Sequence, residues 1–323
     1  MGGRKVVVGT LMFNMFHEYP GLDKRLEELG AFIDTMAERA ELQYPGCGLD
    51  IVALPENAVN GNAKGSAAEV SVPFEGVVLE KMGAKAREHN CYIAVPLYLV
   101  DDREHDRYSN AVVLLDRSGD VVGTYRKYFP VAAYDKNVLE GGVTPGAEFP
   151  VFDCDFGKVG IQICFDISFD DGWEALGKQG AELVLWPTQS PGQIKPAFRA
   201  MQNDYYVLTS TWRNNASLLD PTGHNIRQIT GGDDVFVQLI DLDYVQLMWQ
   251  PKLQDGQIFT KHYGDRVGMR YSRAEDSGIF WSNDPDKSIH QMVQELELEL
   301  PGDLLKRNER LHAQARPSDT AGK

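Results

Sequence analysis

Apolar and polar residues follow one another along the chain with two periods, one typical of strands and one typical of helices. Residues 5–12 form a β-rich apolar run, after which apolar positions recur at steps of four and three, as on one helix face. An apolar run over 50–56, a helical stretch over about 76–89 and an apolar run over 91–100 follow. The first helical face comprises Leu22, Leu26, Leu29, Ile33, Met36 and Ala40. We therefore predict the order β-α-β-α-β for residues 5–100.

Two polar turns interrupt this alternation. The segment 116–120 separates the apolar runs SNAVVLLD and VVGTYRK, and 220–223 repeats the pattern, which is typical of hairpins. Strand-like runs over 158–164, 182–187 and 205–212 alternate with helical stretches near 170–179 and 193–203. Antiparallel hairpins inside an α/β alternation predict a mixed sheet system with helices outside it, rather than a purely parallel doubly wound sheet.

The sequence contains no Ser-, Gly- or Pro-rich linker that would divide the chain. Residues 251–292 are turn-rich and less periodic, and the last ten or so residues are expected to be disordered. The strictly alternating stretch ELELEL at 295–300 fits either an edge strand with a charged outer face or part of a helix. We interpret 1–245 as one domain and 246–323 as a C-terminal extension of it that makes oligomer contacts.

Composition and charge exclude several classes of protein. The chain of 323 residues has 47 acidic and 32 basic side chains, a net charge of −15, which disfavours binding to nucleic acids or anionic membranes. No apolar run is long enough to span a membrane, and the apolar start is interpreted as a buried strand rather than a secretory signal. Four cysteines without zinc or C-x-x-C spacing predict reduced thiols, no metal and a cytoplasmic location.

Three side chains at strand ends could carry chemistry. Cys164 lies at a strand-to-helix turn, where helix amides can favour a thiolate, although a free cysteine is more often a core residue. Glu56 follows Pro55 at the end of an apolar run, where α/β folds place their sites, but it could equally be a solvated loop residue. Lys127 closes an aromatic-rich strand and could be a surface lysine. Each signal is weak on its own.

Together these residues lie in segments that resemble a known family. LPEN at 54–57, YRK at 125–127 and GIQICFD at 160–166 resemble, in order and spacing, the three signature segments of the nitrilase, or carbon–nitrogen hydrolase, superfamily. The resemblance extends over roughly residues 5–245, including both hairpins and the segment WPT at 186–188. Three ordered motifs at the ends of separate strands are far more specific than any one of them.

The resemblance implies a Glu-Lys-Cys triad. Cys164 is expected to be the nucleophile, Glu56 the general base, and Lys127 the stabiliser of the oxyanion together with the backbone N–H of Phe165. Glu140 in LEGGVTPG matches the second glutamate that amidases and carbamoylases of this superfamily place beside the triad; the alternative is an exposed loop residue. Water is then expected to hydrolyse a Cys-bound acyl or carbamoyl thioester.

The residues after the nucleophile bear on the substrate. Phe165-Asp166 is similar to the amidase and carbamoyl hydrolase members, whereas nitrile-cleaving members usually have Trp-Glu there. Carbamoylases of amino acids commonly have an Arg pair shortly after that Asp, and here Ile167-Ser168 stands instead, which favours a neutral or weakly polar amide. Charge could still come from Arg199 or Arg213. Expected pocket residues are Phe165, Tyr128, Trp186, Thr188, Gln189 and Trp212, with Phe129 and Tyr134 as further aromatic candidates; each could equally be ordinary packing.

The resemblance also implies a fold, an assembly and alternatives. The expected fold is a four-layer α-β-β-α sandwich with two mixed β-sheets, which pairs through a helical layer into a homodimer or higher homo-oligomer. The expected enzyme releases ammonia from a small carboxamide or N-carbamoyl compound and needs no cofactor and no metal, because nucleophile, base and electrophile are side chains. The alternatives are a nitrilase with the same triad and a catalytically silent binding or assembly protein on this scaffold.

Overall fold

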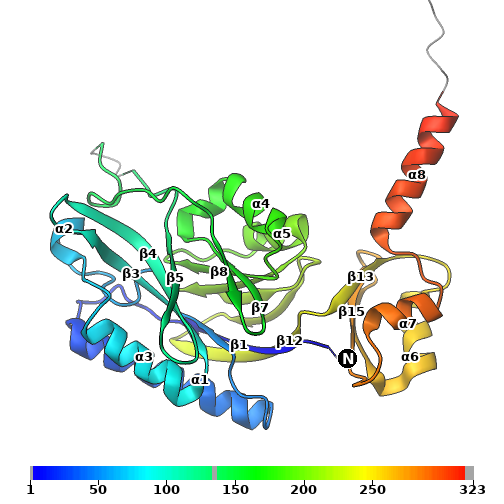
Figure 1. The fold of residues 1–323 in the computed structure, drawn as a ribbon, viewed down its shortest axis with the longest axis horizontal. Coiled ribbons are helices and arrows are strands. Elements are labelled where there is room, and N and C mark those ends of the chain that lie inside the picture. Colours follow the sequence, from blue (N-terminus) through cyan, green and yellow to red (C-terminus); the bar gives the residue numbers. More distant parts are fainter. Residues whose placement is uncertain (1–2, 133–136, 317–323) are drawn as a thin grey trace, which may run out of the picture. The chain divides into compact units, whose positions relative to one another are not determined.

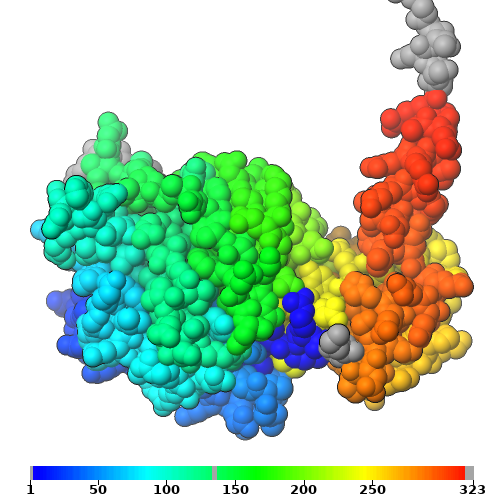
Figure 2. Space-filling model, viewed as in Figure 1, coloured from blue at the N-terminus to red at the C-terminus, as the bar shows by residue number. Residues whose placement is uncertain are grey.

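The computed structural model describes residues 3–132 and 137–316, and within them the chain forms two compact units. The larger is Val6–Ile240, and the smaller combines the described residues of Met1–Lys5 with those of Asp241–Lys323. The interpretation of 246–323 as an extension of a single domain stays a prediction. In Figure 2 the blue, cyan and green segments of the larger unit meet as one closely packed body. None of the described helices combines the length and the apolar character that a membrane span requires.

The larger unit is built on two strand systems joined at one point. One runs in the order β5-β4-β3-β2-β1, with β12 also paired to β1, and the other contains β6 to β11. Among the described strands their one ladder contact is between Met12 of β1 and Thr211 of β9, and the hydroxyls of Thr10 and Ser210 add hydrogen bonds between these two strands. β2 also contacts β8 and β9, which are not its hydrogen-bonded neighbours. The strands are β1 (Lys5–Met12), β2 (Ile51–Ala53), β3 (Tyr92–Asp102), β4 (Arg107–Leu115), β5 (Val121–Arg126), β6 (Val151–Cys154), β7 (Gly157–Ile161), β8 (Leu183–Thr188), β9 (Tyr206–Thr211), β10 (Ala216–Leu219), β11 (Asn225–Ile229) and β12 (Asp234–Asp241).

Helices cover the outer face of each strand system. The long helices α1 (Leu22–Gln43) and α3 (Val77–His89) pack on each other and on β1 to β4, through a core that includes Leu29, Ile33 and Met82. On the other side α4 (Asp171–Lys178) and α5 (Ile194–Asn203) pack through Trp173 and Ala200 on β8 and β9 (Figure 1). A short helix, α2 (Ala67–Val70), lies beside β3 and β4. The expected α-β-β-α sandwich with mixed sheets is confirmed.

Both predicted hairpins are present. β4 and β5 pair antiparallel across the turn at 116–120, where the Asp116 carboxylate accepts hydrogen bonds from the backbone N–H groups of Ser118 (2.8 Å) and Asp120 (3.0 Å). Gly119 completes this turn with a φ of 76°, which a residue with a side chain rarely adopts. β10 and β11 pair in the same way around Gly223, whose φ is 82°. The turn chemistry read from the sequence therefore fixes the positions of β4 and β5.

The smaller unit is more regular than its sequence pattern indicates. β13 (Tyr244–Met248), β15 (Ser277–Ser282) and β14 (Val267–Ser272) form an antiparallel sheet in that order. The remaining elements are η2 (Gln254–Gly256), α6 (Gln257–Tyr263), η3 (Gly264–Arg266), α7 (Ile289–Glu295) and α8 (Pro301–Ala315). Phe259, Phe280 and Met292 are buried in a core of this unit's own. The apolar residues of this unit are too irregularly spaced to show a single period, which is why the pattern does not resolve them.

The alternating stretch at 295–300 adopts neither of the two expected structures. α7 ends at Glu295 and α8 begins at Pro301, so the residues between them belong to no helix or strand. Leu296 and Leu298 are nonetheless buried in the core of the smaller unit, and Glu297 turns the chain with a φ of 51°. Alternation here reflects a turn that buries every second side chain. The expected disorder of the C-terminal end concerns mainly 317–323, which lie outside the described residues.

Candidate active site

The candidate catalytic residues follow strands of both systems. Glu56 comes shortly after β2 and Lys127 directly after β5, both in the first system, whereas Cys164 follows β7 in the second and begins the 3₁₀ helix η1 (Cys164–Ser168). Glu140 lies in the loop after β5, which returns so that the backbone N–H of Glu140 donates to the carbonyl of Val131. The two facing sheets thus bring together four residues that are far apart in the sequence.

Lys127 is the centre of the site. Its Nζ atom lies 2.8 Å from Oε1 of Glu56 and 2.5 Å from Oε1 of Glu140. Lys127 and Glu56 are each only 1% exposed, so this is a buried group of three charges. Burial lowers the pKa of the Lys127 ammonium, but attraction to Glu56, Cys164 and Glu140 outweighs it and raises the pKa well above its ordinary value. Lys127 is therefore a permanent cation held between two carboxylates.

Asn110, on β4, completes this group and was not predicted from the sequence. Its Nδ2 atom donates to Oε1 of Glu56 at 2.8 Å and to Oε2 of Glu140 at 2.9 Å, so one amide holds both carboxylates. The backbone carbonyl of Asn110 accepts a hydrogen bond from the backbone N–H of Lys127 at 2.8 Å. An asparagine inside a buried strand is unfavourable for the strand, and this is the signal that could have identified it.

Glu56 is held from a second direction as well. The backbone N–H of Gln189 donates to Oε2 of Glu56 at 3.1 Å, and the indole N–H of Trp212 donates to its backbone carbonyl at 2.7 Å. One carboxylate oxygen of Glu56 thus faces the lysine and the other faces the loop after β8. A carboxylate fixed at both oxygens is positioned to exchange a proton without reorienting.

Cys164 lies on a strained turn. Its φ is 42°, in the left-handed region that non-glycine residues seldom adopt. The indole N–H of Trp186 donates to the Cys164 carbonyl at 3.0 Å, and Cys164 remains partly exposed. Of the four free cysteines, Cys91 is buried, Cys47 is exposed and Cys154 is intermediate. Only Cys164 combines partial exposure with a place beside Lys127 and Glu56.

The Cys164 thiol is protonated at rest. Burial and the negative charge of Glu56 raise its pKa to about 12, although Lys127, the Thr188 hydroxyl and the Gln189 backbone N–H act in the opposite direction. The sequence argument that helix amides favour a thiolate is therefore outweighed by desolvation. A nucleophile of this kind requires a base that removes its proton as it attacks, and Glu56 is the carboxylate whose charge acts on it.

Asp166 organises the turn that carries Cys164. Its carboxylate accepts hydrogen bonds from the backbone N–H groups of Ile163 (2.8 Å) and Phe129 (2.9 Å) and from the hydroxyl of Tyr125 (2.7 Å). Burial nevertheless raises the pKa of Asp166 to about 6, because Lys127 and these donors compensate only part of the desolvation. Asp166 ties the nucleophile turn to the segment that follows Lys127.

A cavity of about 590 Å³ opens beside Cys164. Three predicted pocket residues, Phe165, Trp186 and Thr188, line it together with the nucleophile. Ile167, Pro191 and Ile194 add further apolar surface. This cavity, which we call the acyl cavity, suits a predominantly apolar group attached to the reacting carbon.

A second cavity of about 340 Å³ lies on the side of Glu140. Gln189 lines it, as expected, and Trp212 does as well. Asn57, Tyr98 and Glu140 give this polar cavity its hydrogen-bonding character. Gln189 contributes to the cavity and to the catalytic group: the residue lines the polar cavity, and its backbone N–H interacts with Glu56 and Cys164.

Other candidates from the sequence lie elsewhere. Tyr128 does not line either cavity: its ring stacks on Phe149, with centroids 4.4 Å apart. Arg199 is committed to Asp170 at 2.5 Å and to two backbone carbonyls, and Arg213 is exposed and packs on a phenylalanine. Phe129 stacks on Phe169, which in turn contacts Phe165 edge to face. Tyr134 lies outside the described residues.

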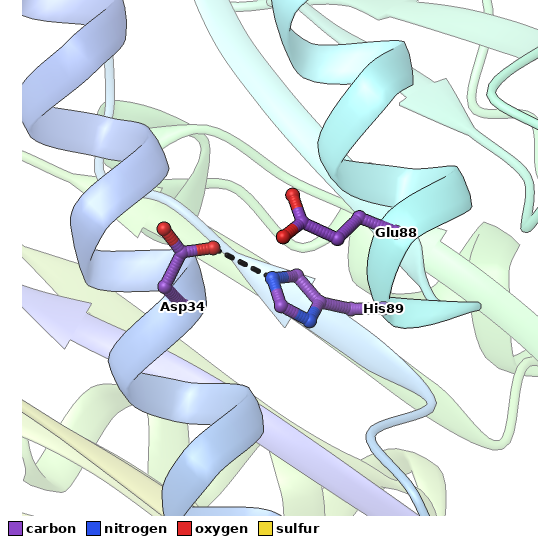
Figure 3. A group of neighbouring side chains, drawn as sticks. All are labelled: Asp34, Glu88 and His89. Carbon is purple, nitrogen blue, oxygen red and sulfur yellow. Dashed lines mark hydrogen bonds and ion pairs between the residues drawn. The ribbon is translucent and has the colours of Figure 1, made fainter.

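One group of potential metal ligands lies away from the site, between α1 and α3. Asp34, Glu88 and His89 have ligand atoms within 4.8 Å of one another, and His89 contacts Asp34 at 2.6 Å (Figure 3). The Lys85 ammonium already donates to Asp34 at 2.7 Å and to Glu88 at 2.8 Å. A metal ion would have to compete with this ammonium for the same oxygens. The group is best described as an ion-pair cluster that joins the two helices.

Comparisons with known proteins find similar sequences and a shared fold. Beta-ureidopropionase of Arabidopsis thaliana is 25% identical over 146 residues, which cover 43% of this chain and 36% of that protein, so the chain matches about a third of its length. Deaminated glutathione amidase of Dictyostelium discoideum is 26% identical over 197 residues, covering 53% of this chain and 67% of that protein. A mutant amidase from Nesterenkonia sp. AN1, solved with the acetamide moiety of fluoroacetamide added at its active-site cysteine, shares the fold. Its TM-score is 0.61 at 16% identity, over 75% of this chain and 92% of that one.

The family itself is shown by a match over most of the chain. Residues 21–249 match the model of the carbon-nitrogen hydrolase family. That range contains Glu56, Lys127, Glu140 and Cys164, the four residues that the fold assembles. The chain therefore belongs to the carbon–nitrogen hydrolase family, in the nitrilase superfamily.

Proposed function

We propose that the protein is a thiol hydrolase that cleaves the C–N bond of a small amide through an acyl group bound to Cys164. The observation that carries this proposal is the buried Lys127 ammonium, fixed between Glu56 and Glu140 next to a partly exposed cysteine. Such an arrangement supplies a base, a nucleophile and a fixed positive charge within one site. In the related amidase fold, the active-site cysteine accepts a covalent acetamide adduct, which supports a covalent route.

The acylation step begins with the protonated thiol. Glu56 takes the proton from Sγ of Cys164 while sulfur attacks the carbonyl carbon, forming a C–S bond and a tetrahedral oxyanion. Two N–H bonds of Lys127 point to the carboxylates, and the third, with the backbone N–H of Phe165, stabilises the oxyanion. Glu56 then returns its proton to the nitrogen, the C–N bond breaks and ammonia leaves.

Hydrolysis of the thioester uses the same residues, but Glu56 now deprotonates water and protonates the leaving thiolate. A water molecule enters the position vacated by ammonia, and Glu56 removes its proton as the oxygen attacks the thioester carbon. The tetrahedral intermediate collapses with cleavage of the C–S bond, and Cys164 recovers its proton from Glu56. The raised pKa of the Cys164 thiol makes it a poor leaving group unless it is protonated, so this return of the proton is part of the step. Glu140 and Asn110 keep the lysine and Glu56 in place throughout.

The acyl cavity favours an amide whose acyl group is largely apolar. Phe165, Trp186 and Ile167 surround Cys164, and within the described residues the only cation that lines this cavity is Lys195. The Arg pair common in amino-acid carbamoylases is absent, Ile167-Ser168 stands in its place, and Arg199 is committed to Asp170. An anionic substrate would therefore find little compensation here. We propose a neutral carboxamide or N-carbamoyl compound as the substrate class.

The experiment that tests this function is a substrate panel. Ammonia release is measured with primary amides, N-carbamoyl compounds and nitriles of matched carbon skeletons, with Cys164→Ala as the control for background hydrolysis. We expect turnover of the neutral amides or carbamoyl compounds that is lost in the Cys164→Ala variant. Turnover of nitriles alone would assign the protein as a nitrilase, and no turnover of any class would leave only a non-catalytic role.

We also propose that the protein acts as a cytoplasmic homo-oligomer. Ile194, Phe198 and Met201 lie at helical spacing on α5 and are 85%, 49% and 54% exposed, so one face of this helix carries an apolar stripe. A second copy of the chain would cover such a stripe. We expect light scattering to show that Phe198→Glu reduces the mass of the assembly; an unchanged mass would place the contacts elsewhere. Four free cysteines are consistent with a reducing compartment.

A further inference from the structure

Asn57 occupies a place in the site that the proposed mechanism does not use. It follows the general base Glu56, is fully buried, and lines the polar cavity on the side of Glu140. Neither its Nδ2 nor its Oδ1 atom has a hydrogen-bond partner among the described residues. The phenol of Tyr98 lies near enough to interact with this amide, but no hydrogen bond between them has acceptable geometry. A buried amide without partners is rare and calls for a ligand group that pairs with it.

Two neighbouring asparagines show that the lack of hydrogen-bond partners is specific to Asn57 and not general in this loop. Asn60 is equally buried, but its Nδ2 donates to the carbonyls of Val70 (2.9 Å) and Tyr98 (3.0 Å), and its Oδ1 accepts from the Tyr98 backbone N–H at 2.9 Å. Asn62 lines the same cavity as Asn57, but its amide donates to the His17 carbonyl. Asn57 and Asn62 share a left-handed backbone, with φ values of 53° and 64°. Of these three asparagines, only Asn57 has a side-chain amide without a partner among the described residues.

The chemistry of the cavity defines what can pair with this amide. An amide offers both a donor and an acceptor, so a group with both, such as a carboxamide or a ureido group, satisfies it completely. The cavity is also lined by the Glu140 carboxylate, and no Lys or Arg lines it within the described part of the chain. A carboxylate on the substrate would therefore be repelled, whereas a neutral polar group would not.

Gln189 lies between the polar cavity and the reaction centre. This residue lines the cavity, and its backbone N–H interacts with both Glu56 and Cys164. We propose that Asn57 is a specificity-determining residue that binds a second, neutral carboxamide or ureido group of the substrate. This inference rests on the proposed amide hydrolysis at Cys164. Water can pair with the amide in the free protein, and the substrate group replaces that water on binding.

The test uses paired substrates and paired variants. The substrates are linear primary diamides of increasing chain length, each compared with the amide in which an isopropyl group replaces the distal carboxamide and leaves the shape unchanged. The variants are Asn57→Gly and Asn62→Gly. Glycine adopts the left-handed conformation freely, so each variant removes an amide without straining the backbone. The measured quantity is the ratio of kcat/KM for diamide over isopropyl amide, in which any general loss of activity cancels.

We expect the unmodified protein to prefer the diamide and Asn57→Gly to lower the ratio at least tenfold, equivalent to about 1.4 kcal/mol. Asn62→Gly should leave the ratio within about twofold. Equal turnover of both amides by the unmodified protein, or an Asn57→Gly ratio no lower than that of Asn62→Gly, would overturn the assignment of Asn57.

A binding measurement separates this inference from the proposed function. If no amide is turned over, the proposed function fails, and Asn57 is then judged by the thermal shift that millimolar diamide produces in the Cys164→Ala background. A shift that Asn57→Gly abolishes and Asn62→Gly preserves supports the role of Asn57. No shift, or a shift that both variants keep, overturns it.

Discussion

Removal of the buried ammonium of Lys127 should make stability depend on pH. Glu56 and Glu140 each place one oxygen on Nζ, at 2.8 and 2.5 Å, so these two oxygens are at most about 5.3 Å apart. At this distance and an effective dielectric constant of about 20, two negative charges repel by about 3 kcal/mol. In the native protein the ammonium offsets this repulsion. In Lys127→Met, which keeps most of the side-chain volume, this cation is lost and only neutral donors such as the Asn110 amide remain.

The sign of the pH dependence follows from proton binding. The folded variant lowers the repulsion by keeping a proton on one of the two carboxyls, whereas the unfolded chain releases its carboxyl protons near pH 4 to 5. Because the folded state then holds more protons, stability falls as pH rises above that range. We expect Lys127→Met to lose about 3 kcal/mol more stability at pH 8 than at pH 4.5, relative to the native protein.

Urea unfolding at several pH values measures this loss. The matched control is Lys127→Met combined with Glu56→Gln and Glu140→Gln, which removes both carboxylates and should abolish the additional pH dependence. A loss of stability in Lys127→Met that is the same at pH 4.5 and pH 8 would refute the account of Lys127 as a buried counter-ion. So would a triple variant that keeps the pH dependence of the single one.

Three further outcomes are expected. Because the pKa of the Cys164 thiol is raised to about 12, kcat/KM should stay level between about pH 7 and pH 9; a rise centred near pH 8.5 would show an ordinary titrating thiol. Asn110→Leu removes one donor from each carboxylate and should lower kcat by about ten- to a hundredfold with the fold intact by circular dichroism; an unchanged kcat would restrict Asn110 to a structural role. The folded pKa of Asp166 is raised to about 6, so this group adds stability below about pH 4 and loses it as pH rises through 6. The stability of the native protein relative to Asp166→Asn should therefore fall by about 2 kcal/mol between pH 4 and pH 7, and a constant difference in urea unfolding would contradict this.

The fold of the larger unit could be predicted from the sequence because its signals are local. The spacing of Leu26, Leu29 and Ile33 defines the buried face of α1, and the turn around Gly119 requires the hairpin of β4 and β5. The stretch at 295–300 could not be assigned, because alternation in a short segment is compatible with a strand, a helix end or a turn. Its structure is set by burial of Leu296 and Leu298 in a core formed by distant residues.

The candidate site could likewise be predicted from the sequence only in part. Glu56, Lys127 and Cys164 stand in recognisable segments at strand ends, and the structure brings them together with Glu140. Asn110 lies in no such segment, and Asn57 closes the segment LPEN without a signal of its own, because the importance of both comes from what their amides face in the folded protein. The pKa of the Cys164 thiol could not be predicted either, because burial depends on packing that adjacent residues do not reveal. Pair distances and desolvation are properties of the fold, and the sequence specifies them only indirectly.

The central claim, a covalent acyl group on Cys164, is tested most directly by the intact mass of the protein quenched in acid during turnover of a primary amide. We predict a population heavier by the mass of the amide less ammonia, mapped by peptide analysis to Cys164 and missing from Cys164→Ala. Continued release of ammonia without this species, even when hydrolysis is slowed at low temperature, or an adduct on Cys47, Cys91 or Cys154 would contradict the account.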